Sequence, residues 1–164
     1  MRIFLVRHGD ADAEVPEALS DEARALTPKA RRALIAHFGS ISDRMSGVEL
    51  ILTSPLVRAV QTAQILSLVN NHEGLLHAHR GLLPDMPVGA LDTVIKENAG
   101  KDLVLVGHQP SMGALAAHLL ALASFPRQFN PGTVIGLERN VEEESSPIKL
   151  LFYAAPGQPV LEEF

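Results

Sequence analysis

RIFLVRHG, residues 2–9, is a short apolar run of β-favouring residues that ends in an arginine, a histidine and a glycine. Four consecutive apolar residues at 3–6 are typical of a strand that is buried on both faces, as in a parallel sheet. Arg7, His8 and Gly9 therefore lie where the predicted strand ends. Taken alone, these three residues are either an ordinary polar exit from a strand or part of a reactive centre.

Further short apolar runs alternate with helical patterns along the chain. The predicted strands after the first are residues 49–53, 75–79 and 102–107, and the predicted helices are residues 27–41, 55–69, about 89–98 and a fourth that starts at 110–111. Thr27-Pro28 and Ser54-Pro55 each combine a capping residue with a proline, which favours the start of a helix. This alternation predicts an α/β three-layer α/β/α sandwich, with a mostly parallel central sheet covered by helices on both faces.

The last part of the chain changes character. Two apolar runs at 133–139 and 148–154 flank a polar connection at 140–147 that is too short for a crossover helix. We therefore expect these runs to pair as antiparallel strands at the end of the sheet. Residues 156–164 are expected to form an irregular tail. The length suits one domain, so residues 1–164 are predicted to form a single domain.

The composition limits the possible classes of function. A content of 46% hydrophobic and 20% charged residues is typical of a globular protein. The net charge of −5 argues against broad binding to nucleic acid or to anionic membranes, and no stretch approaches a membrane-spanning length. The absence of cysteine excludes disulfides, thiolate zinc sites and a cysteine nucleophile. We expect a cytoplasmic protein with no nucleic-acid or membrane partner.

Two arginines and two histidines follow predicted strands. Arg7 and His8 follow the first strand, Arg58 lies one turn into the helix after the second, and His108 follows the fourth. The carboxyl ends of parallel strands share one edge of a sheet, so these side chains can converge there. Gly9 is expected to let the backbone turn so that Arg7 and His8 serve one pocket.

This group of side chains suits phosphoryl transfer. Paired guanidinium groups match a dianionic phosphoryl group in charge and geometry. One neutral imidazole can attack phosphorus, and a second imidazole, when protonated, can stabilise the oxygens during transfer. The scheme requires no metal ion and no cofactor.

Three motifs in this order and strand context resemble the histidine phosphatase superfamily, also called phosphoglycerate mutase-like. They are RHG at 7–9, TSPLVRAVQTA at 53–63 and VGHQP at 106–110. The small size, the sequence RHGDA and the lack of a long insertion are most similar to SixA-type phosphohistidine phosphatases. The resemblance extends from the first strand to at least Gly113. It implies a phosphoglycerate mutase-like fold, with residues 1–164 as a single histidine phosphatase domain.

Transferred to the matching positions, the family pattern implies roles for the four residues that follow the strands. His8 would be the nucleophile that becomes phosphorylated, and Arg7 and Arg58 would hold the phosphate. His108 would be the second imidazole of the pocket. The activity implied is that of a phosphatase with a phosphohistidine intermediate.

Three further residues have two interpretations each. Arg24 occupies a position where SixA-like proteins carry an arginine, so it is either a phosphate or substrate ligand or a solvated charge of the long loop at 10–26. Ser54 either adds a hydrogen bond to the pocket or simply caps a helix. Asp85 follows the third strand and is either the general acid that protonates the leaving group or an ordinary turn residue.

A metal site finds little support in the sequence. His77 and His79 fall on one face of a strand and could form a metal pair, but no third ligand is evident. We therefore interpret them as exposed residues. A His-based metal hydrolase would also need a carboxylate–histidine spacing that the chain does not show.

The predicted substrate is phosphohistidine on a protein, such as the phosphotransfer domain of a signalling relay. A chain this short has little material for a lid, and an open site accepts a side chain presented by a protein. Imidazole has a reference pKa of about 6.5, so it leaves more readily than an alkyl alcohol when the general acid is weak. The alternatives are a phosphatase or mutase acting on a small phosphate ester, and a catalytically silent phosphoprotein-binding module.

Overall fold

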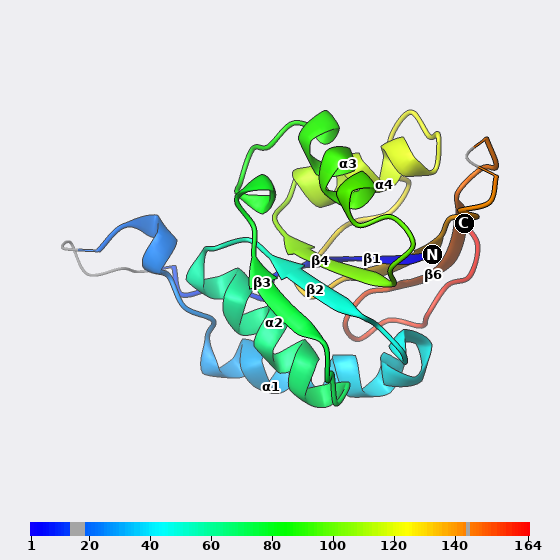
Figure 1. Ribbon diagram of the computed structural model, residues 1–164. Helices are drawn as coiled ribbons and strands as arrows, with labels where there is room; N and C mark the ends of the chain where they lie inside the picture. Colours follow the sequence, from blue (N-terminus) through cyan, green and yellow to red (C-terminus); the bar gives the residue numbers. More distant parts are fainter. Residues whose placement is uncertain (14–18, 144) are drawn as a thin grey trace.

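The computed structural model describes residues 1–13, 19–143 and 145–164 of the chain. It contains one six-stranded sheet with α1 and α2 on one face and α3 and α4 on the other (Figure 1). This is the α/β three-layer sandwich that the alternation of strands and helices predicts. Of the predicted loop at 10–26, residues 14–18 lie outside the described part.

The sheet is mostly parallel, as expected. Its strands are β1 (Arg2–Arg7), β2 (Leu50–Thr53), β3 (Leu75–Ala78), β4 (Leu103–Gly107), β5 (Val134–Glu138) and β6 (Lys149–Ala154), in the order β3-β2-β4-β1-β5-β6. The first four strands are parallel to one another, and β5 is antiparallel to both β1 and β6. The predicted antiparallel pairing of the last two strands is therefore confirmed, and β6 runs in the same direction as β1.

The apolar run of β1 is explained by burial on both faces of the sheet. Phe4 and Val6 belong to the core beneath α1 and α2, whereas Ile3 and Leu5 belong to the core beneath α3 and α4. All four side chains are fully buried. Successive residues of a strand point to opposite faces, so a strand between two helical layers must be apolar at every position.

The helices connect the strands and begin at the carboxyl edge of the sheet. They are α1 (Pro28–Ile41), α2 (Val57–Val69), α3 (Val88–Glu97) and α4 (Ser111–Leu119), with short 3₁₀ helices η1 (Asp21–Ala23), η2 (Ser42–Met45) and η3 (Arg80–Leu82). Thr27 caps α1 as predicted, because its hydroxyl accepts a hydrogen bond from the Ala30 N–H at 3.0 Å. The other predicted start is wrong: α2 begins at Val57, with Leu56 rather than Ser54 as its N-cap.

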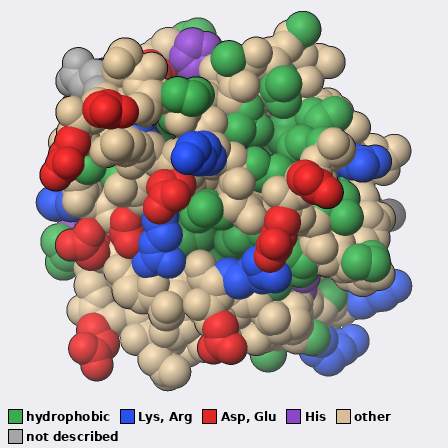
Figure 2. All heavy atoms as spheres, turned by 90° about the vertical axis from the view of Figure 1, so that its right-hand side faces the viewer, with side chains coloured by type: hydrophobic (Ala, Val, Ile, Leu, Met, Phe, Trp, Pro, Cys, Tyr) green, Lys and Arg blue, Asp and Glu red, His purple; other side chains and the backbone are tan. Residues whose placement is uncertain are grey.

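Both chain ends lie near the amino edge of the parallel strands (Figure 1). The surface seen from that side carries basic and acidic side chains interspersed around apolar ones (Figure 2). The tail at 156–164 is not wholly irregular, since Leu161 and Tyr153 exchange backbone hydrogen bonds of 2.7 and 2.9 Å beside β6. Within the described ranges, no helix combines the length and apolar character needed to cross a membrane.

Candidate active site

The strand order brings three strand ends together at the carboxyl edge of the sheet. β4 lies between β1 and β2, so the residues that follow these strands are neighbours. The His8 N–H donates to the Gly107 carbonyl at 3.1 Å, and the Ser54 N–H donates to the Val106 carbonyl at 2.9 Å. These bonds extend the hydrogen bonding between the parallel strands by one residue. His8, Ser54 and His108 therefore lie side by side, directly after the ends of β1, β2 and β4.

The two histidines of this edge are in contact. The ring centroids of His8 and His108 are 5.0 Å apart, with an angle of 60° between the ring planes. His8 Nδ1 lies 2.7 Å from the Gly9 carbonyl oxygen. A carbonyl only accepts, so Nδ1 carries the proton of the neutral ring and Nε2 keeps its lone pair. The geometry thus selects the tautomer in which Nε2 is the nucleophilic atom.

Both imidazoles are neutral near pH 7. Burial, followed by the charges of Arg58 and Arg7, lowers the pKa of His8 to about 4. Burial and the neighbouring His8 and arginine charges lower the pKa of His108 to about 3, against an opposing effect of Asp21. In the scheme for phosphoryl transfer, the second imidazole acts in its protonated form. A bound phosphoryl dianion would raise the pKa of His108 and so favour that protonation.

Because the imidazoles of His8 and His108 stay neutral in the folded protein, the free energy of unfolding depends on pH. The pKa values of His8 and His108 in the folded protein lie below the unfolded value of about 6.5. The unfolded chain therefore binds protons first, and the free energy of unfolding falls as the pH drops from about 6.5 through about 4. Above the unfolded pKa this contribution is fully present. Urea unfolding of His108→Ala should show a smaller loss between pH 7 and pH 4.5 than the wild type or His77→Ala, and an equal loss would contradict this assignment.

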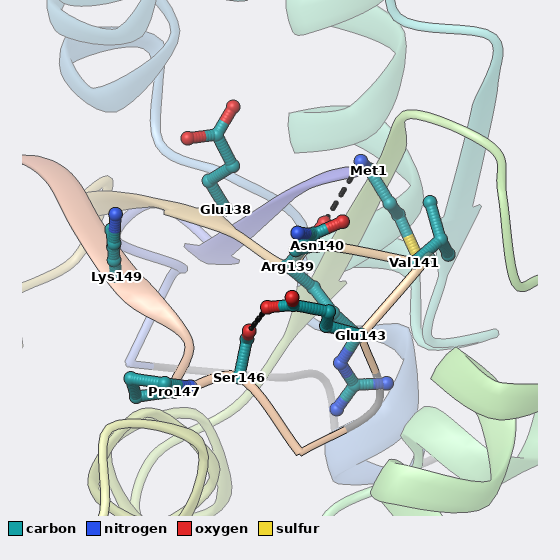
Figure 3. Close-up of a pocket in the computed structure, with 9 residues that line it drawn as sticks. All are labelled: Met1, Glu138, Arg139, Asn140, Val141, Glu143, Ser146, Pro147 and Lys149. Atoms are coloured by element: carbon teal, nitrogen blue, oxygen red, sulfur yellow. Dashed lines mark hydrogen bonds between the residues drawn. The ribbon is translucent and has the colours of Figure 1, made fainter.

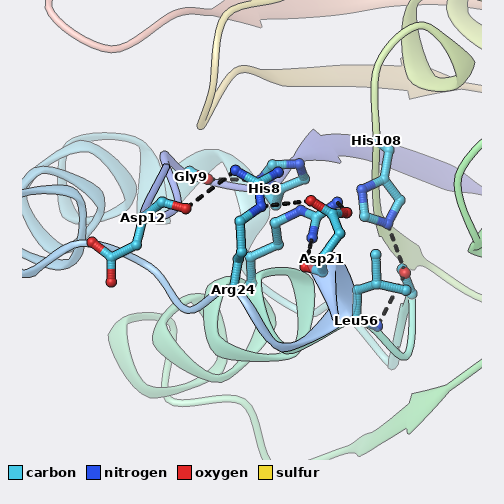
Figure 4. Close-up of polar contacts among 9 residues, drawn as sticks. His8, Gly9, Asp12, Asp21, Arg24, Leu56 and His108 are labelled. Atoms are coloured by element: carbon cyan, nitrogen blue, oxygen red, sulfur yellow. Dashed lines mark hydrogen bonds and ion pairs between the residues drawn. The ribbon is translucent and has the colours of Figure 1, made fainter. Parts of the chain in front are cut away.

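Ser54 holds the second imidazole. Its Oγ lies 2.7 Å from His108 Nε2 and accepts a hydrogen bond of 3.3 Å from the Leu56 N–H. The Ser54 hydroxyl proton is then available to His108 Nε2, which leaves Nδ1–H as the donor on the side of the ring that faces Asp21 (Figure 4). Of its two interpretations, Ser54 thus has the pocket hydrogen bond and not the helix cap.

Arg7 is held from three sides by the segment before β5. Its Nη1 donates to the Phe129 carbonyl at 2.9 Å, and its backbone N–H donates to the Thr133 carbonyl at 3.1 Å. The Gly132 N–H in turn donates to the Arg7 carbonyl at 3.0 Å. Burial lowers the pKa of Arg7. Its Nε has no hydrogen-bond partner among the described residues, so this donor remains available to an anion.

Arg58 lies on the first turn of α2 and is almost completely buried. Its Nη1 donates to the Asp21 carbonyl at 3.1 Å, and its Nη2 lies 3.3 Å from Asp21 Oδ2. Within the described part of the chain, the buried Nε of Arg58 also lacks a partner. Arg7 and Arg58 therefore each have a buried Nε–H without a hydrogen-bond partner among the described residues.

Arg24 approaches the same pocket from the long loop. Its Nε lies 2.7 Å from Asp21 Oδ1, and its Nη1 donates to the Asp12 carbonyl at 3.2 Å. Its positive charge also contributes to the lowered pKa of His8. Figure 4 shows Arg24, Asp21 and His8 close together. Of the two interpretations of Arg24, this placement favours the pocket over a solvated charge.

Gly9 packs closely against the core beneath α1. Its φ is not among the positive values of the chain, so the residue does not adopt the left-handed conformation that favours glycine. A Cβ at Gly9 would lie 2.7 Å from Leu34 Cδ1 and 3.2 Å from Leu26 Cδ2. A side chain there would therefore require Leu34 and Leu26 to shift.

Thr62 is a supporting residue that the sequence analysis misses. Its hydroxyl accepts from the Gly9 N–H at 3.1 Å and donates to the Arg58 carbonyl at 2.8 Å, which ties the His8 loop to α2. The available signal is helical spacing, since Thr62 is four residues after Arg58 and shares its helix face. Gln61 has a similar role, with its Oε1 accepting from the Leu26 N–H at 2.8 Å.

Asp85 has a different environment from the four residues above. It lies in the turn after η3 with a φ of +63°, a left-handed conformation that aspartate tolerates. In the described ranges, no hydrogen bond or ion pair joins Asp85 to His8, Arg58 or His108. Residues 1–13, 19–143 and 145–164 also contain no cluster of three His, Asp or Glu side chains suited to a metal ion.

A groove of about 500 Å³ lies at the other edge of the sheet, where β5 ends and β6 begins (Figure 3). Met1, Arg139, Glu143 and Lys149 are among its lining residues. This lining mixes cations with carboxylates and includes no imidazole. The paired histidines and arginines at the carboxyl edge are therefore the candidate site.

The fold and this group of side chains define an α/β enzyme of phosphoryl transfer. Comparison with known proteins gives the family: the chain belongs to the histidine phosphatase superfamily and is a phosphatase of the SixA type. The model of the histidine phosphatase superfamily (branch 1) matches residues 3–82.

Relatives and a solved structure agree with this assignment. The chain is 30% identical over 154 residues to a phosphohistidine phosphatase SixA homolog of Haemophilus influenzae, covering 84% of this chain and 87% of that protein. It is 32% identical over 124 residues to phosphohistidine phosphatase SixA of Escherichia coli, covering 73% and 74%. The structure of the protein histidine phosphatase SixA complexed with tungstate superposes with a TM-score of 0.81 at 26% identity, covering 95% and 97%.

Proposed function

We propose that the chain is a metal-independent phosphatase that forms a phosphohistidine at His8. The observation that carries this proposal is the hydrogen bond of 2.7 Å between His8 Nδ1 and the Gly9 carbonyl, which leaves Nε2 unprotonated. The pKa of about 4 keeps the ring neutral at physiological pH. His8 is thus prepared to act as a nucleophile without a separate base.

The reaction would proceed in two displacements at phosphorus. In the first, the lone pair of His8 Nε2 forms a P–N bond while the bond between phosphorus and the leaving imidazole of the substrate breaks, and that imidazole departs with the proton that it already carries. In the second, a water oxygen forms a P–O bond as the P–Nε2 bond breaks, and the protons of the water leave on the phosphate. Phosphate is released, and the neutral imidazole of His8 is restored.

The protein's own cations would stabilise the charge that this reaction develops. Arg7 and Arg58 would hold the phosphoryl oxygens through the buried Nε–H groups that the described residues leave unpaired. His108, held by Ser54, would donate from Nδ1, and Arg24 would add charge at the mouth. These donors serve the purpose for which other phosphoryl-transfer enzymes use a metal ion.

We propose phosphohistidine on a phosphotransfer protein as the substrate. Two SixA relatives carry that activity in their names. Asp85 is the residue considered as general acid, and no described contact ties it to His8 or His108. A reaction with a weak acid favours a leaving group that is already partly protonated, and imidazole has a reference pKa of about 6.5.

A substrate comparison tests this proposal. The wild type should release phosphate from a phosphohistidine phosphotransfer protein, and excess chelator should leave the rate unchanged. Asp85→Asn should keep phosphohistidine turnover within about twofold of wild type, while its slow turnover of a small phosphate ester falls by about tenfold or more, because an alkoxide needs the proton. Asparagine also tolerates the left-handed backbone of residue 85.

Other results of this substrate comparison would contradict the leaving-group argument or support one of the two alternative functions. Equal losses on both substrates in Asp85→Asn, relative to the control Asp43→Asn in η2, would contradict the leaving-group argument. Phosphate release from the ester alone would make the chain a small-ester phosphatase. Binding of the phosphorylated protein without any turnover would make it a phosphoprotein-binding module.

A further inference from the structure

Asp21 of η1 is bound to two arginines of the candidate site, Arg24 and Arg58. Its Oδ1 is 2.7 Å from Arg24 Nε, and its Oδ2 is 3.3 Å from Arg58 Nη2. Its backbone carbonyl accepts a further hydrogen bond of 3.1 Å from Arg58 Nη1. Figure 4 shows Asp21 between Arg24 and His108. Both terminal nitrogens of Arg58 are therefore directed at one residue of the loop.

A carboxylate and a phosphoryl group compete for the same donors, because a guanidinium group binds two oxygens of either anion in the same way. Asp21 uses donors of Arg58 and Arg24 that an anion in the pocket would also use. The charge of Asp21 also acts inside the pocket, where it opposes the lowering of the pKa of His108. An incoming dianion thus meets a negative charge already in place.

We propose that the Asp21 carboxylate competes with phosphate for the donors of Arg58, so that free inorganic phosphate binds weakly. The choice of a protein-borne substrate rests on the function proposed above, whereas the competition itself does not. The product of the reaction is phosphate, and a pocket of two imidazoles and three guanidinium groups would otherwise retain it. Asp21 favours its release.

The exposure of the two partners shows which of them moves. The Asp21 side chain is 65% exposed, whereas that of Arg58 is 7% exposed. The carboxylate can therefore move from Arg58 into water, and the buried guanidinium group stays paired because the phosphoryl group takes the place of the carboxylate. Arg58 stays in place, and Asp21 can remain paired with Arg24 while the phosphoryl group takes the vacated donors.

The competition has different consequences for inorganic phosphate and for a phosphoryl group on a protein side chain. Inorganic phosphate must displace Asp21 with the energy of its own contacts in the pocket. A phosphoryl group on a protein side chain arrives with additional contacts outside the pocket, and these contribute to the displacement. Asp21 therefore lowers both affinities by the same factor. A protein-borne group can still occupy the pocket because of its additional contacts, whereas free phosphate has no other binding energy and occupies the pocket less.

Binding of inorganic phosphate to the purified enzyme tests the proposal directly. Isothermal titration or ³¹P NMR should show that Asp21→Asn and Asp21→Ala bind phosphate about fivefold or more tightly than the wild type, since a charge near the anion is removed. Glu22→Gln is the matched control, because Glu22 is an exposed carboxylate of the same 3₁₀ helix. Its affinity should stay within about twofold of wild type.

Two results would overturn the inference. Weaker phosphate binding in both Asp21 variants would make Asp21 a residue that positions Arg58, and equal tightening in Glu22→Gln would reduce the effect to overall charge. The proposed function is tested separately by turnover of phosphohistidine. If the wild type fails to hydrolyse phosphohistidine while Asp21→Asn binds phosphate more tightly, the substrate assignment fails and the competition stands.

Discussion

Replacing His8 with alanine is expected to abolish phosphate release, with a fall in kcat of about 10⁴-fold or more, because the atom that forms the P–N bond is removed. The remaining arginines still hold the phosphoryl group in this variant. His8→Ala should therefore bind the phosphorylated substrate and fail to turn it over. Phosphate release under saturating substrate measures the loss, and substrate binding measured by titration shows that the pocket persists.

Covalent labelling completes the test of His8. Brief reaction of the wild type with a phosphorylated substrate should leave an acid-labile phosphoryl group on His8, and none should appear in His8→Ala. His77→Ala is the control, since it removes an exposed imidazole from β3. Normal turnover by His8→Ala would refute the mechanism, and a wild type that binds but never becomes labelled would be a binding module.

Replacing Arg58 with alanine is expected to lower kcat/KM by about 10²–10³-fold, because a buried donor to the phosphoryl group is lost. Arg58→Lys should recover little of this activity, since a single ammonium group cannot match the guanidinium geometry. The charge of Arg58 lowers the pKa of both His8 and His108. Its removal should therefore raise both pKa values toward 6.5, which NMR titration of the imidazoles measures.

The pKa readout separates a role in the pocket from a structural role. Arg32→Ala is the matched control, because Arg32 is an exposed arginine of α1. Arg32→Ala should change neither the turnover nor the titration of His8. If Arg58→Ala leaves kcat/KM within the range of that control, Arg58 does not hold the phosphoryl group.

Local sequence patterns predict most of the fold. The continuous apolar runs of β1 and β4 reflect burial on both faces, and the Thr27-Pro28 pair marks the start of α1. The order of the strands could not be derived, because it depends on packing between segments that are distant in the chain. The start of α2 was misplaced because Ser54, which has the chemistry of a cap, is bonded to His108 instead.

The candidate site was partly predictable for a similar reason. His8 and His108 follow strands directly, so the general rule for parallel sheets places them at one edge. Asp21 and Thr62 were not predicted to contribute, since their partners become visible only when the long loop and α2 are placed against β1. A solvated charge and a pocket residue have the same local sequence, which is why Arg24 had two interpretations.

The pairing of β1 with β4 has a consequence for how such an enzyme can change. Arg7 is paired with Gly107, and Thr53 with Val106, so the separation of the reacting groups is set by hydrogen bonds between strands. Parts of the connections that carry neither Arg24 nor Arg58 can lengthen or shorten without moving His8, Ser54 or His108. Loss of one residue within β4 would instead turn every later side chain of the strand to the opposite face. Changes in loop length can therefore alter the entrance to the pocket, while the spacing between His8, Ser54 and His108 stays the same.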